Sequence, residues 1–415
     1  MTMRPFTSTI TLTEARRLID AAVTPVTGRE LVPLHEALGR VLAGDVRATG
    51  DVPPFARAGM DGYAVRASDT AGASAALPVA LQLVDRVFTG QVSARAVGAG
   101  ECIEIATGAP MPLGADAVVM VEDTVEHTVE DTDAGTPSGG TRIGIRAAVA
   151  PGQHVGRQGA DIAAGQTVLP DGTLLNASRL GALAALGITE APVYVRPRVA
   201  ILSTGNEIVE PGEALGAGQI YDINRFTLGA VVTAHGGSAE PHRAAADTLD
   251  ALLDALDACA DADVVVFSGG SSVGERDLMI DALAQRGRVV FHGIAVKPGK
   301  PTAFGIVGRT LVFGMPGYPA SCLSNAYILL APVIRRLARL PAPHHPPVRA
   351  TLGSGIKSVA SRHQIYTVRL SGTTALPAFK ASGDITSLSQ ADGYIEIPAG
   401  VDTLDAGTVV DVHLF

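Results

Sequence analysis

Cysteine and tryptophan are scarce in this sequence of 415 residues, which has three cysteines and no tryptophan. The three cysteines, Cys102, Cys259 and Cys322, lie far apart and form no CxxC pair. This spacing predicts neither a disulfide framework nor a zinc site, because both need cysteines that can approach one another in sets. We therefore expect three reduced thiols that pack as small apolar groups.

Long apolar runs are also missing. The segment most similar to a membrane span, residues 327–340, is interrupted by Pro332 and by Arg335, Arg336 and Arg339. A span needs about 18 consecutive apolar residues, so we expect none. The first residues of the sequence lack the apolar stretch of a signal peptide, and we expect a cytoplasmic protein.

An excess of positive charge is absent as well. The 32 Lys and Arg residues are outnumbered by 41 Asp and Glu residues, which gives a formal net charge of -9. Binding to nucleic acid without sequence preference depends on Lys and Arg that neutralise phosphates, so we expect no nucleic-acid partner. Any anionic ligand must instead be held by local groups.

The composition that remains is that of a globular protein, with 47% hydrophobic and 18% charged residues. A chain of this length is too long for one core and predicts several domains. Residues 1–46 and 150–196 carry helical patterns and predict one mixed domain that residues 47–149, a β-rich insertion, interrupt. Strands alternate with helices over residues 197–340, which predicts an α/β domain with a mostly parallel sheet. Residues 341–415 begin with a Pro-rich linker and predict a small all-β domain.

Two helix starts are marked by capping residues. Thr11 and Glu14 have the spacing of a capping box before a helix predicted over residues 13–23. Asn176 precedes a second helix, predicted over residues 177–186, which Gly187 ends.

Each strong strand of the α/β domain runs directly into a loop of small residues. These loops cover residues 203–207, 268–274 and 314–319. Ligands of open parallel sheets bind beyond the carboxyl ends of the strands, so the three loops are expected on one face. A single such loop is explained equally well as a tight turn, but three together favour a binding site.

The loop of residues 268–274 has the composition of an anion cradle. Its glycines let backbone N–H groups approach an oxyanion, and the following helix adds its positive end. Neither G-x-G-x-x-G nor a Walker A sequence is present; the nearest candidate, residues 293–301, has Pro301 where Ser or Thr would bind magnesium. The pattern therefore does not favour a generic nucleotidase.

Two lysines, Lys297 and Lys300, lie in a Lys-Pro-Gly-Lys-Pro segment whose prolines restrict the backbone. Such a segment holds positive charge at a fixed place, although on its own a solvated turn is the better explanation. Asp277 opens the next helix after the anion loop, either as an N-cap or as a ligand of a hard cation.

Further acids lie at dispersed places, and each by itself is a turn acid or a helix cap. If they converge beside the anion loops, a divalent cation is needed between them and an anionic substrate. Carboxylates together with phosphates are the usual environment of magnesium. These acids are Asp61, Asp161, Glu207 and Asp222.

Seven motifs, taken in order, resemble the MoeA and gephyrin E-domain family, the molybdopterin molybdotransferases, over almost the whole chain. Each motif is weak alone, but the probability that all seven occur in this order by chance is very small. The motifs are Met60-Asp-Gly-Tyr-Ala-Val65, Thr107-Gly-Ala-Pro110, Ser203-Thr-Gly205, Gln219-Ile-Tyr-Asp222, Ser268-Gly-Gly270 with Ser272-Val-Gly-Glu275, Lys297-Pro-Gly-Lys-Pro301, and Pro316-Gly-Tyr-Pro319.

The resemblance implies a homodimer whose protomer has a MogA-like, molybdopterin-binding α/β domain and a C-terminal β-barrel beside the interrupted N-terminal domain. It implies a transferase that takes adenylylated molybdopterin and molybdate as substrates, uses Mg2+, inserts molybdenum and releases AMP. Catalysis would then consist of positioning and electrostatic stabilisation.

The resemblance also implies roles for particular residues. The catalytic residues would be Asp61, Asp161, Glu207, Asp277 and Lys297, and the metal ligands Glu207, Asp277 and, from the neighbouring subunit, Asp61. The residues that bind the pterin cofactor, its phosphates and molybdate would be Thr107, Ser203, Thr204, Gly205, Asp222, Ser268, Gly269, Gly270, Ser271, Ser272, Lys300, Pro316, Pro319 and Ser387.

The sequence departs from the commonest family pattern at four positions. Asn206 stands where the family often has Asp, and Ala245 lies where an acid is frequent. Gly293 replaces a basic residue of some members, and Tyr318 stands where many members have Asn. Two other functions stay open at this point. One is a gephyrin-like scaffold without catalysis that binds a protein partner in a groove beside the C-terminal domain, and the other is the molybdopterin adenylyltransferase activity of the MogA family.

Overall fold

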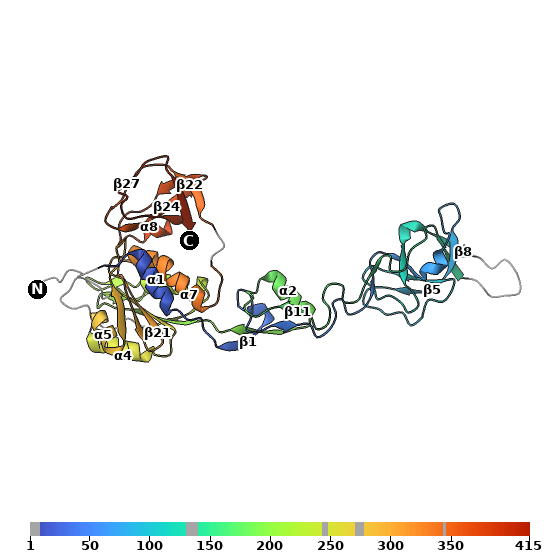
Figure 1. The fold of residues 1–415 in the computed structure, drawn as a ribbon, viewed down its shortest axis with the longest axis horizontal. Coiled ribbons are helices and arrows are strands. Elements are labelled where there is room, and N and C mark those ends of the chain that lie inside the picture. The colour runs from blue at the N-terminus through green and yellow to red at the C-terminus, as the bar shows by residue number, and fades with distance from the viewer. Residues whose placement is uncertain (1–8, 130–139, 243–247, 270–277, 343–345) are drawn as a thin grey trace, which may run out of the picture. The chain divides into compact units, whose positions relative to one another are not determined.

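The computed structural model describes residues 9–129, 140–242, 248–269, 278–342 and 346–415, which form two compact units (Figure 1). The larger unit comprises Met1–Val32, Glu36–Ala43 and Pro192–Phe415. The smaller unit comprises Pro33–His35 and Gly44–Ala191. The chain passes between them at β1 (Arg29–Pro33) and β12 (Glu190–Tyr194), which pair as a two-stranded sheet.

A six-stranded sheet in the order β16-β13-β17-β21-β20-β18 forms the centre of the larger unit. The first four strands are parallel, and β20 and β18 run antiparallel to their neighbours. The predicted, mostly parallel sheet is therefore confirmed. The strands are β13 (Arg198–Ser203), β16 (Ser238–Pro241), β17 (Val264–Ser268), β18 (Arg288–His292), β20 (Ala303–Val307) and β21 (Thr310–Met315).

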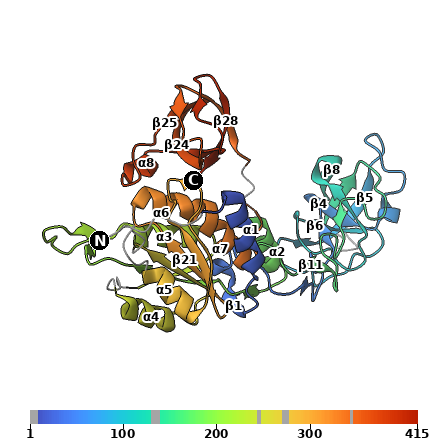
Figure 2. The ribbon, with the colours of Figure 1, turned by 60° about the vertical axis from the view of Figure 1, so that its left-hand side comes forward.

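Helices cover both faces of this sheet, which explains why its central strands, β13, β17 and β21, are continuous apolar runs. Val199 and Ile201 of β13 pack in the core that faces α1, α3 and α7, whereas Ala200 and Leu202 pack in the core that faces α4 and α5. Figure 2 shows α4 and α5 on one side of β21 and α6 and α7 on the other. The helices are α1 (Leu12–Ala22), α3 (Asn224–Ala234), α4 (Leu249–Ala258), α5 (Leu278–Arg286), α6 (Pro319–Asn325) and α7 (Ala331–Leu337), and a π-helical segment (Ala326–Leu330) joins the last two.

The predicted capping residues begin their helices as expected. The Thr11 Oγ1 accepts a hydrogen bond from the Glu14 backbone N–H at 3.2 Å. The Asn176 Oδ1 accepts from the Arg179 backbone N–H at 3.0 Å at the start of α2 (Ala177–Ala185) in the smaller unit. Both helices lie within one residue of the predicted bounds.

The C-terminal part of the larger unit is a closed barrel of five strands, as the resemblance implied. The order is β24-β25-β22-β28-β26, and a further pairing between β24 and β26 closes it. A short strand, β19 (Val296–Lys297), pairs with β24 and so joins the barrel to the α/β part. The barrel elements are β22 (Val348–Leu352), β24 (His363–Ser371), β25 (Thr374–Pro377), β26 (Gly393–Ile397) and β28 (Val409–Leu414), with β23 (Ile356–Lys357), β27 (Thr403–Leu404) and α8 (Thr386–Ser389) beside them.

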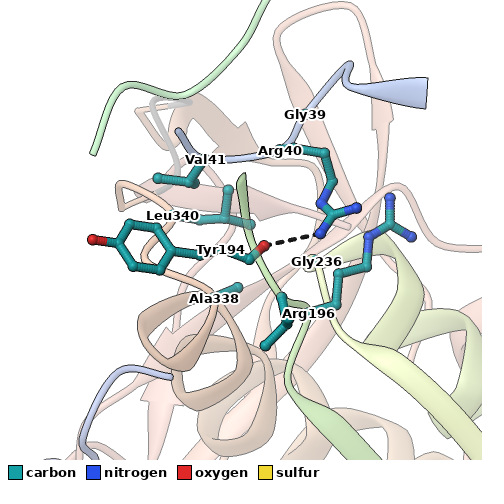
Figure 3. Close-up of a pocket in the computed structure, with 9 residues that line it drawn as sticks. Gly39, Arg40, Val41, Tyr194, Arg196, Gly236, Ala338 and Leu340 are labelled. Atoms are coloured by element: carbon teal, nitrogen blue, oxygen red, sulfur yellow. Dashed lines mark hydrogen bonds between the residues drawn. The ribbon is translucent and has the colours of Figure 1, made fainter. Parts of the chain in front are cut away.

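Arginine side chains contact residues of β1 and β12 within the larger unit. The buried Arg40 pairs with Glu30. It also donates to the Tyr194 backbone oxygen at 2.9 Å (Figure 3). The Arg339 guanidinium lies 4.1 Å from the centroid of the Tyr194 ring. The hollow between Arg40 and Arg196 has a volume of about 10 Å³, which is room for about one water molecule, so we assign it a structural role.

The smaller unit is β-rich, as predicted for the insertion. Its sheet has six strands in the order β7-β4-β6-β5-β9-β8, with buried residues on both faces. The strands are β4 (Gly62–Val65), β5 (Val79–Val87), β6 (Glu101–Ile105), β7 (Ala117–Met120), β8 (Thr124–Val129) and β9 (Gly140–Ile145). Two further pairs, β2 (Val46–Arg47) with β11 (Thr167–Leu169) and β3 (Arg57–Ala58) with β10 (Val155–Gly156), complete it.

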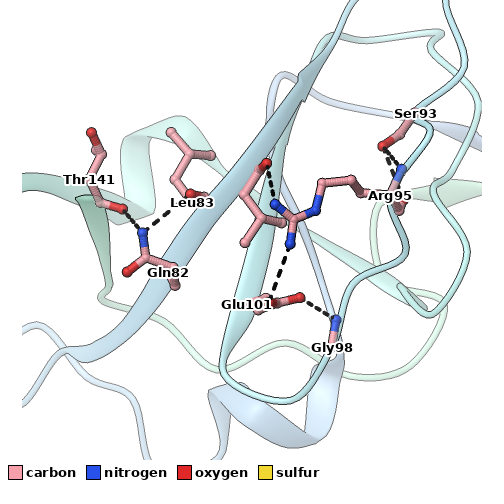
Figure 4. Close-up of polar contacts among 8 residues, drawn as sticks. Gln82, Leu83, Ser93, Arg95, Gly98, Glu101 and Thr141 are labelled. Atoms are coloured by element: carbon pink, nitrogen blue, oxygen red, sulfur yellow. Dashed lines mark hydrogen bonds and ion pairs between the residues drawn. The ribbon is translucent and has the colours of Figure 1, made fainter. Parts of the chain in front are cut away.

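Side chains fix the loop that connects β5 to β6 (Figure 4). The Glu101 carboxylate accepts from the Gly98 backbone N–H at 2.8 Å and lies 3.9 Å from the Arg95 guanidinium. The Ser93 hydroxyl donates to Asp85 of β5 at 2.6 Å. The loop is thus held by residues of the strands that it connects. Within the sheet, Gln82 of β5 donates to the Thr141 backbone oxygen of β9 at 3.2 Å.

The three cysteines are free and buried, as expected of thiols that pack as small apolar groups. Burial raises the pKa of the Cys102 thiol to about 12, so that thiol stays protonated and unreactive. In the part of the chain that the structure describes, no helix is long and apolar enough to cross a membrane.

Candidate active site

A cavity of about 1040 Å³ opens where β13, β17 and β21 end. It lies where the sequence predicted a site, because the strands are parallel neighbours and their carboxyl ends meet at one edge of the sheet. Two further groups contribute to its lining, namely the segment between Val296 and Pro301 and residues of the barrel, Arg362, Ser382 and Gly383.

The three loops after these strands touch one another, and this contact requires small residues. The Thr204 backbone N–H donates to the Ser268 oxygen at 2.9 Å, and the Gly269 N–H donates to the Met315 oxygen at 3.3 Å. Gly269 has a φ of 103°, and a Cβ there would lie 2.3 Å from the Thr204 backbone oxygen. A Cβ on Gly317 would lie 3.3 Å from the Gly269 Cα. Glycine is therefore needed at position 269.

One wall carries acids. Glu207 precedes β14 (Ile208–Val209), and its backbone oxygen accepts from the Ile220 N–H of β15 (Ile220–Tyr221) at 2.9 Å. Its exposed carboxylate lies over Gly205, where a Cβ would come within 2.6 Å of the Glu207 Oε2. Asp222 is buried, and its carboxylate accepts from the Arg225 backbone N–H in the first turn of α3 at 3.0 Å. Glu207 is thus the more accessible of the two carboxylates.

Another part of the wall carries cations. The half-buried Lys297 and Lys300 both line the cavity. The pairing of β19 with β24 brings Val296 opposite His363 and so places the neighbouring Arg362 at the cavity. Sequence reasoning missed Arg362, since nothing local in the sequence announces a pairing between segments so far apart.

Three buried polar atoms on the cavity wall have no hydrogen-bond partner among the described residues, namely the Ser203 Oγ, the Thr204 Oγ1 and the Asn224 Oδ1. Buried polar groups are normally paired, and exceptions often mark sites that bind a ligand. Asn224 was not among the predicted site residues, although it lies two residues after the Gln219–Asp222 motif. Its Nδ2 donates to the Gly317 backbone oxygen at 2.8 Å.

The structure gathers ten of the predicted residues around this cavity, and Gly205 belongs to the first loop. Tyr318, which replaces the common Asn, also lines the cavity and is 68% exposed. Ser387 does not line it; the Ser387 hydroxyl accepts from the Lys380 N–H at 3.0 Å. The ten lining residues are Ser203, Thr204, Glu207, Asp222, Ser268, Gly269, Lys297, Lys300, Pro316 and Pro319.

Three predicted residues belong to the smaller unit. The Asp61 carboxylate accepts from the Thr107 backbone N–H at 2.7 Å, and this hydrogen bond lowers the pKa of Asp61. Asp61 and Thr107, both exposed, are thereby held side by side. Asp161 is also exposed, and its backbone N–H donates to the Val52 oxygen at 3.0 Å.

The remaining predicted residues, Gly270, Ser271, Ser272 and Asp277, lie outside the described residues, as does Ala245. Among the residues that are described, no group of three His, Cys, Asp or Glu side chains could hold a metal ion. The ligand set Glu207, Asp277 and Asp61 therefore stays a prediction.

Three domain families match successive parts of the chain. Residues 10–187 match "MoeA N-terminal region (domain I and II)", residues 200–336 match "Probable molybdopterin binding domain", and residues 349–415 match "MoeA C-terminal region (domain IV)".

Individual proteins are similar over nearly the same length. The molybdopterin molybdenumtransferase 2 of Mycobacterium tuberculosis is 37% identical over 401 residues, which are 94% of this chain and 95% of that protein. The molybdopterin molybdenumtransferase of Staphylococcus epidermidis is 29% identical over 92% of this chain and 90% of its own length. The crystal structure of the molybdopterin biosynthesis MoeA protein from Pyrococcus horikosii superposes with a TM-score of 0.84 at 38% identity, covering 98% of this chain and 99% of that one. The chain therefore belongs to the MoeA family of molybdopterin molybdenumtransferases.

Proposed function

We propose that this protein is a molybdopterin molybdenumtransferase that takes molybdate and adenylylated molybdopterin, inserts molybdenum into the pterin and releases AMP. The observation that carries the proposal is the cavity, which combines Lys297, Lys300 and Arg362 with the accessible carboxylate of Glu207. The names of the relatives support molybdenum transfer, and the AMP-carrying substrate is inferred from the resemblance.

The lining residues suit oxygen-rich anions. Ammonium and guanidinium groups bind molybdate and phosphate oxygens through charge-assisted hydrogen bonds. The Ser203 and Thr204 hydroxyls can donate or accept, and the cavity is large enough for a molecule of pterin-nucleotide size. In this proposal the chain binds and orients two anionic substrates, and fixed positive groups offset the charge that would otherwise keep them apart.

For Mg2+ we propose only that Glu207, Asp277 and Asp61 would be its ligands. The described residues do not by themselves form a metal site, so we derive no catalytic step through this ion. A direct test is equilibrium binding of Mn2+, which substitutes for Mg2+, to the full chain and to the Glu207→Gln variant. Equal binding by both proteins would remove Glu207 from the ligand set.

Adenylylation is the first alternative function. The chain matches MoeA domain families on both sides of its molybdopterin-binding domain, which favours molybdenum transfer over the adenylyltransferase alternative. The non-catalytic scaffold has no specific support among the described residues.

The proposed activity is tested by incubating the purified full chain with adenylylated molybdopterin, molybdate and Mg2+. We expect AMP and metallated cofactor, and AMP formation no higher than in a protein-free control would contradict the proposal. Supplying ATP with bare molybdopterin tests the adenylyltransferase alternative in the same assay.

Lys297→Met should reduce AMP release at least about tenfold, because one charge-assisted hydrogen bond to an anion is worth about 1.5 kcal/mol or more. Lys357→Met is the matched control, since Lys357 is exposed and does not line the cavity. Equal losses in the two variants would argue against an anion site at Lys297.

The homodimer, with Asp61 supplied to the neighbouring subunit's site, is also a proposal. It predicts that inactive Asp61→Ala and Lys297→Met proteins complement each other when mixed and allowed to exchange subunits. Random exchange makes half of the dimers mixed, each with one intact site, so about a quarter of the wild-type activity should return. No recovery in a mixture shown by light scattering to be dimeric would place Asp61 in its own subunit's site or outside the site.

A further inference from the structure

Lysine is rare in this chain and is concentrated at the cavity. Only four of the 32 basic residues are lysines, and two of them, Lys297 and Lys300, lie three residues apart in the loop that lines the cavity. The other two, Lys357 and Lys380, are exposed and do not line it. A lysine side chain is long and flexible, so the place of its ammonium group depends on how firmly its backbone is held.

The backbone of this loop is held by a fully buried amide, that of Asn325 at the end of α6. The Asn325 Nδ2 donates to the Gly299 backbone oxygen at 3.0 Å and to the Thr302 Oγ1 at 2.6 Å. The Thr302 hydroxyl in turn donates to the same Gly299 oxygen at 2.8 Å. One carbonyl between the two lysines is therefore fixed by two side-chain donors.

Gly299 packs so closely against the Asn325 amide that no larger residue fits at position 299. Gly299 has a φ of 100°, and a Cβ there would lie 2.2 Å from the Asn325 Nδ2. The next carbonyl along the chain, that of Lys300, accepts from the N–H groups of Ile294 and Thr302 at 3.0 and 2.9 Å. Two successive carbonyls of the loop are thus clamped by hydrogen bonds.

Asn325 also has features that core packing does not explain. Its Oδ1 has no hydrogen-bond partner among the described residues, and a buried unpaired acceptor costs about 1 to 3 kcal/mol. The helix passes into π-helical geometry directly after Asn325, where the Ala331 N–H bonds to the Ala326 oxygen. Such π segments are frequent at functional sites. An apolar side chain would fill the space without the unpaired acceptor, so the donor on Asn325 must serve another purpose.

We infer that Asn325, together with Thr302, is a positioning residue that holds the Lys297–Pro301 segment so that its two ammonium groups face the cavity and grip an oxyanion. This inference rests on the proposed function for the identity of the oxyanion, molybdate. The clamp itself is a property of the loop and can be measured without turnover.

The first experiment measures how fast each lysine is acetylated by N-hydroxysuccinimidyl acetate in the full chain, with mass spectrometry as the readout. Four lysines make the assignment simple, and Lys357 and Lys380 are internal controls. In Asn325→Ala and Thr302→Val, we expect acetylation of Lys297 and Lys300 to change by about threefold or more, because local opening exposes a loop whose tertiary hydrogen bonds are lost. Thr302→Ser keeps the hydroxyl and should behave like wild type.

The second experiment measures molybdate binding by equilibrium dialysis. Loss of one buried hydrogen bond that fixes the loop should weaken binding about tenfold in Asn325→Ala. Val333→Ala is the matched control for stability, because Val333 is buried in the same continuous helical region and does not line the cavity. It should lower the melting temperature without changing molybdate binding or lysine acetylation.

The outcomes separate the inference from the proposed function. Unchanged acetylation of Lys297 and Lys300 in both Asn325→Ala and Thr302→Val would overturn the positioning role, and so would equal changes in Val333→Ala. If wild type binds no molybdate and releases no AMP while the two lysines still respond to Asn325→Ala, the proposed function fails and the clamp stands.

Discussion

Glu396 is a residue whose charge state is strongly affected by its neighbours. It lies on β26 of the barrel, and its carboxylate accepts from the His363 Nε2 at 3.0 Å and from the Arg16 guanidinium at 2.9 Å. Burial alone would raise the pKa of Glu396, but the hydrogen bonds from His363 and Arg16 lower it to about 2. The carboxylate therefore ties the barrel to α1 as long as it is ionised.

This arrangement predicts a pH dependence of stability. A carboxyl group with a depressed pKa in the folded protein stabilises it above the unfolded value of about 4.3, and the stabilisation is lost as the pH falls towards 2. A difference of that size corresponds to roughly 3 kcal/mol at neutral pH. We expect the melting temperature of the larger unit to fall more steeply between pH 5 and pH 2 in wild type than in Glu396→Gln.

Calorimetry at matched ionic strength provides this comparison, with Glu213→Gln as a control because Glu213 is exposed and has no ion pair among the described residues. If the melting temperatures of wild type and Glu396→Gln fall in parallel as the pH decreases, Glu396 does not contribute to the pH dependence of stability.

At the scale of elements, the three strand-end loops act as one structure, and Gly269 is their common point of contact. An alanine there must displace the Thr204 backbone and also adopt a positive φ. We expect Gly269→Ala to lower the free energy of unfolding by about 1 to 3 kcal/mol. It should also abolish AMP release, because the walls of the cavity would move apart.

Gly172→Ala is the appropriate comparison for this prediction. Gly172 also has a positive φ, 77°, but a Cβ added there would meet nothing within 4 Å, so this variant carries the backbone strain without the collision. If the two variants destabilise the protein equally and both retain activity, the contact at Gly269 has no functional importance.

The elements show which parts of the fold a sequence can predict. Local chemistry predicted α1 and α2, since the capping side chains of Thr11 and Asn176 act on backbone groups three residues away. Apolar runs predicted β13, β17 and β21, and their parallel order then placed the loops correctly. The antiparallel strand β20 was missed, because Ala303–Val307 follows a Pro- and Gly-rich segment and pairs with β18 and β21 only through tertiary structure.

The cavity could be predicted only in part for the same reason. Residues after the strands, such as Ser203 and Ser268, follow from the sheet. Arg362, Asn224 and Asn325 depend on pairings and packing between distant segments, and no local pattern distinguishes them. The roles of Asp61, Thr107 and Asp161 came from the family resemblance alone and stay predictions.

At the scale of the whole molecule, the two units differ in how far each is built from one stretch of chain. The smaller unit takes Gly44–Ala191 together with Pro33–His35, and the two cores that flank its six-stranded sheet lie within the longer stretch. The larger unit combines distant stretches of the chain, because Leu12, Ala15 and Ile19 of α1 are buried in the same core as β13 and β17.

This difference predicts how fragments behave. A fragment of residues 44–191 should fold alone, since it retains its complete six-stranded sheet and loses no buried residue of its main cores. A fragment of residues 192–415 should be aggregation-prone, because removing α1 uncovers apolar side chains that the core normally buries. Dispersed amide signals in the NMR spectrum of the first fragment, and their absence in the second, would support this division. Adding a peptide of residues 9–32 should then restore the second fragment, whereas a fragment of residues 192–415 that folds without the peptide would show that α1 is dispensable for the core.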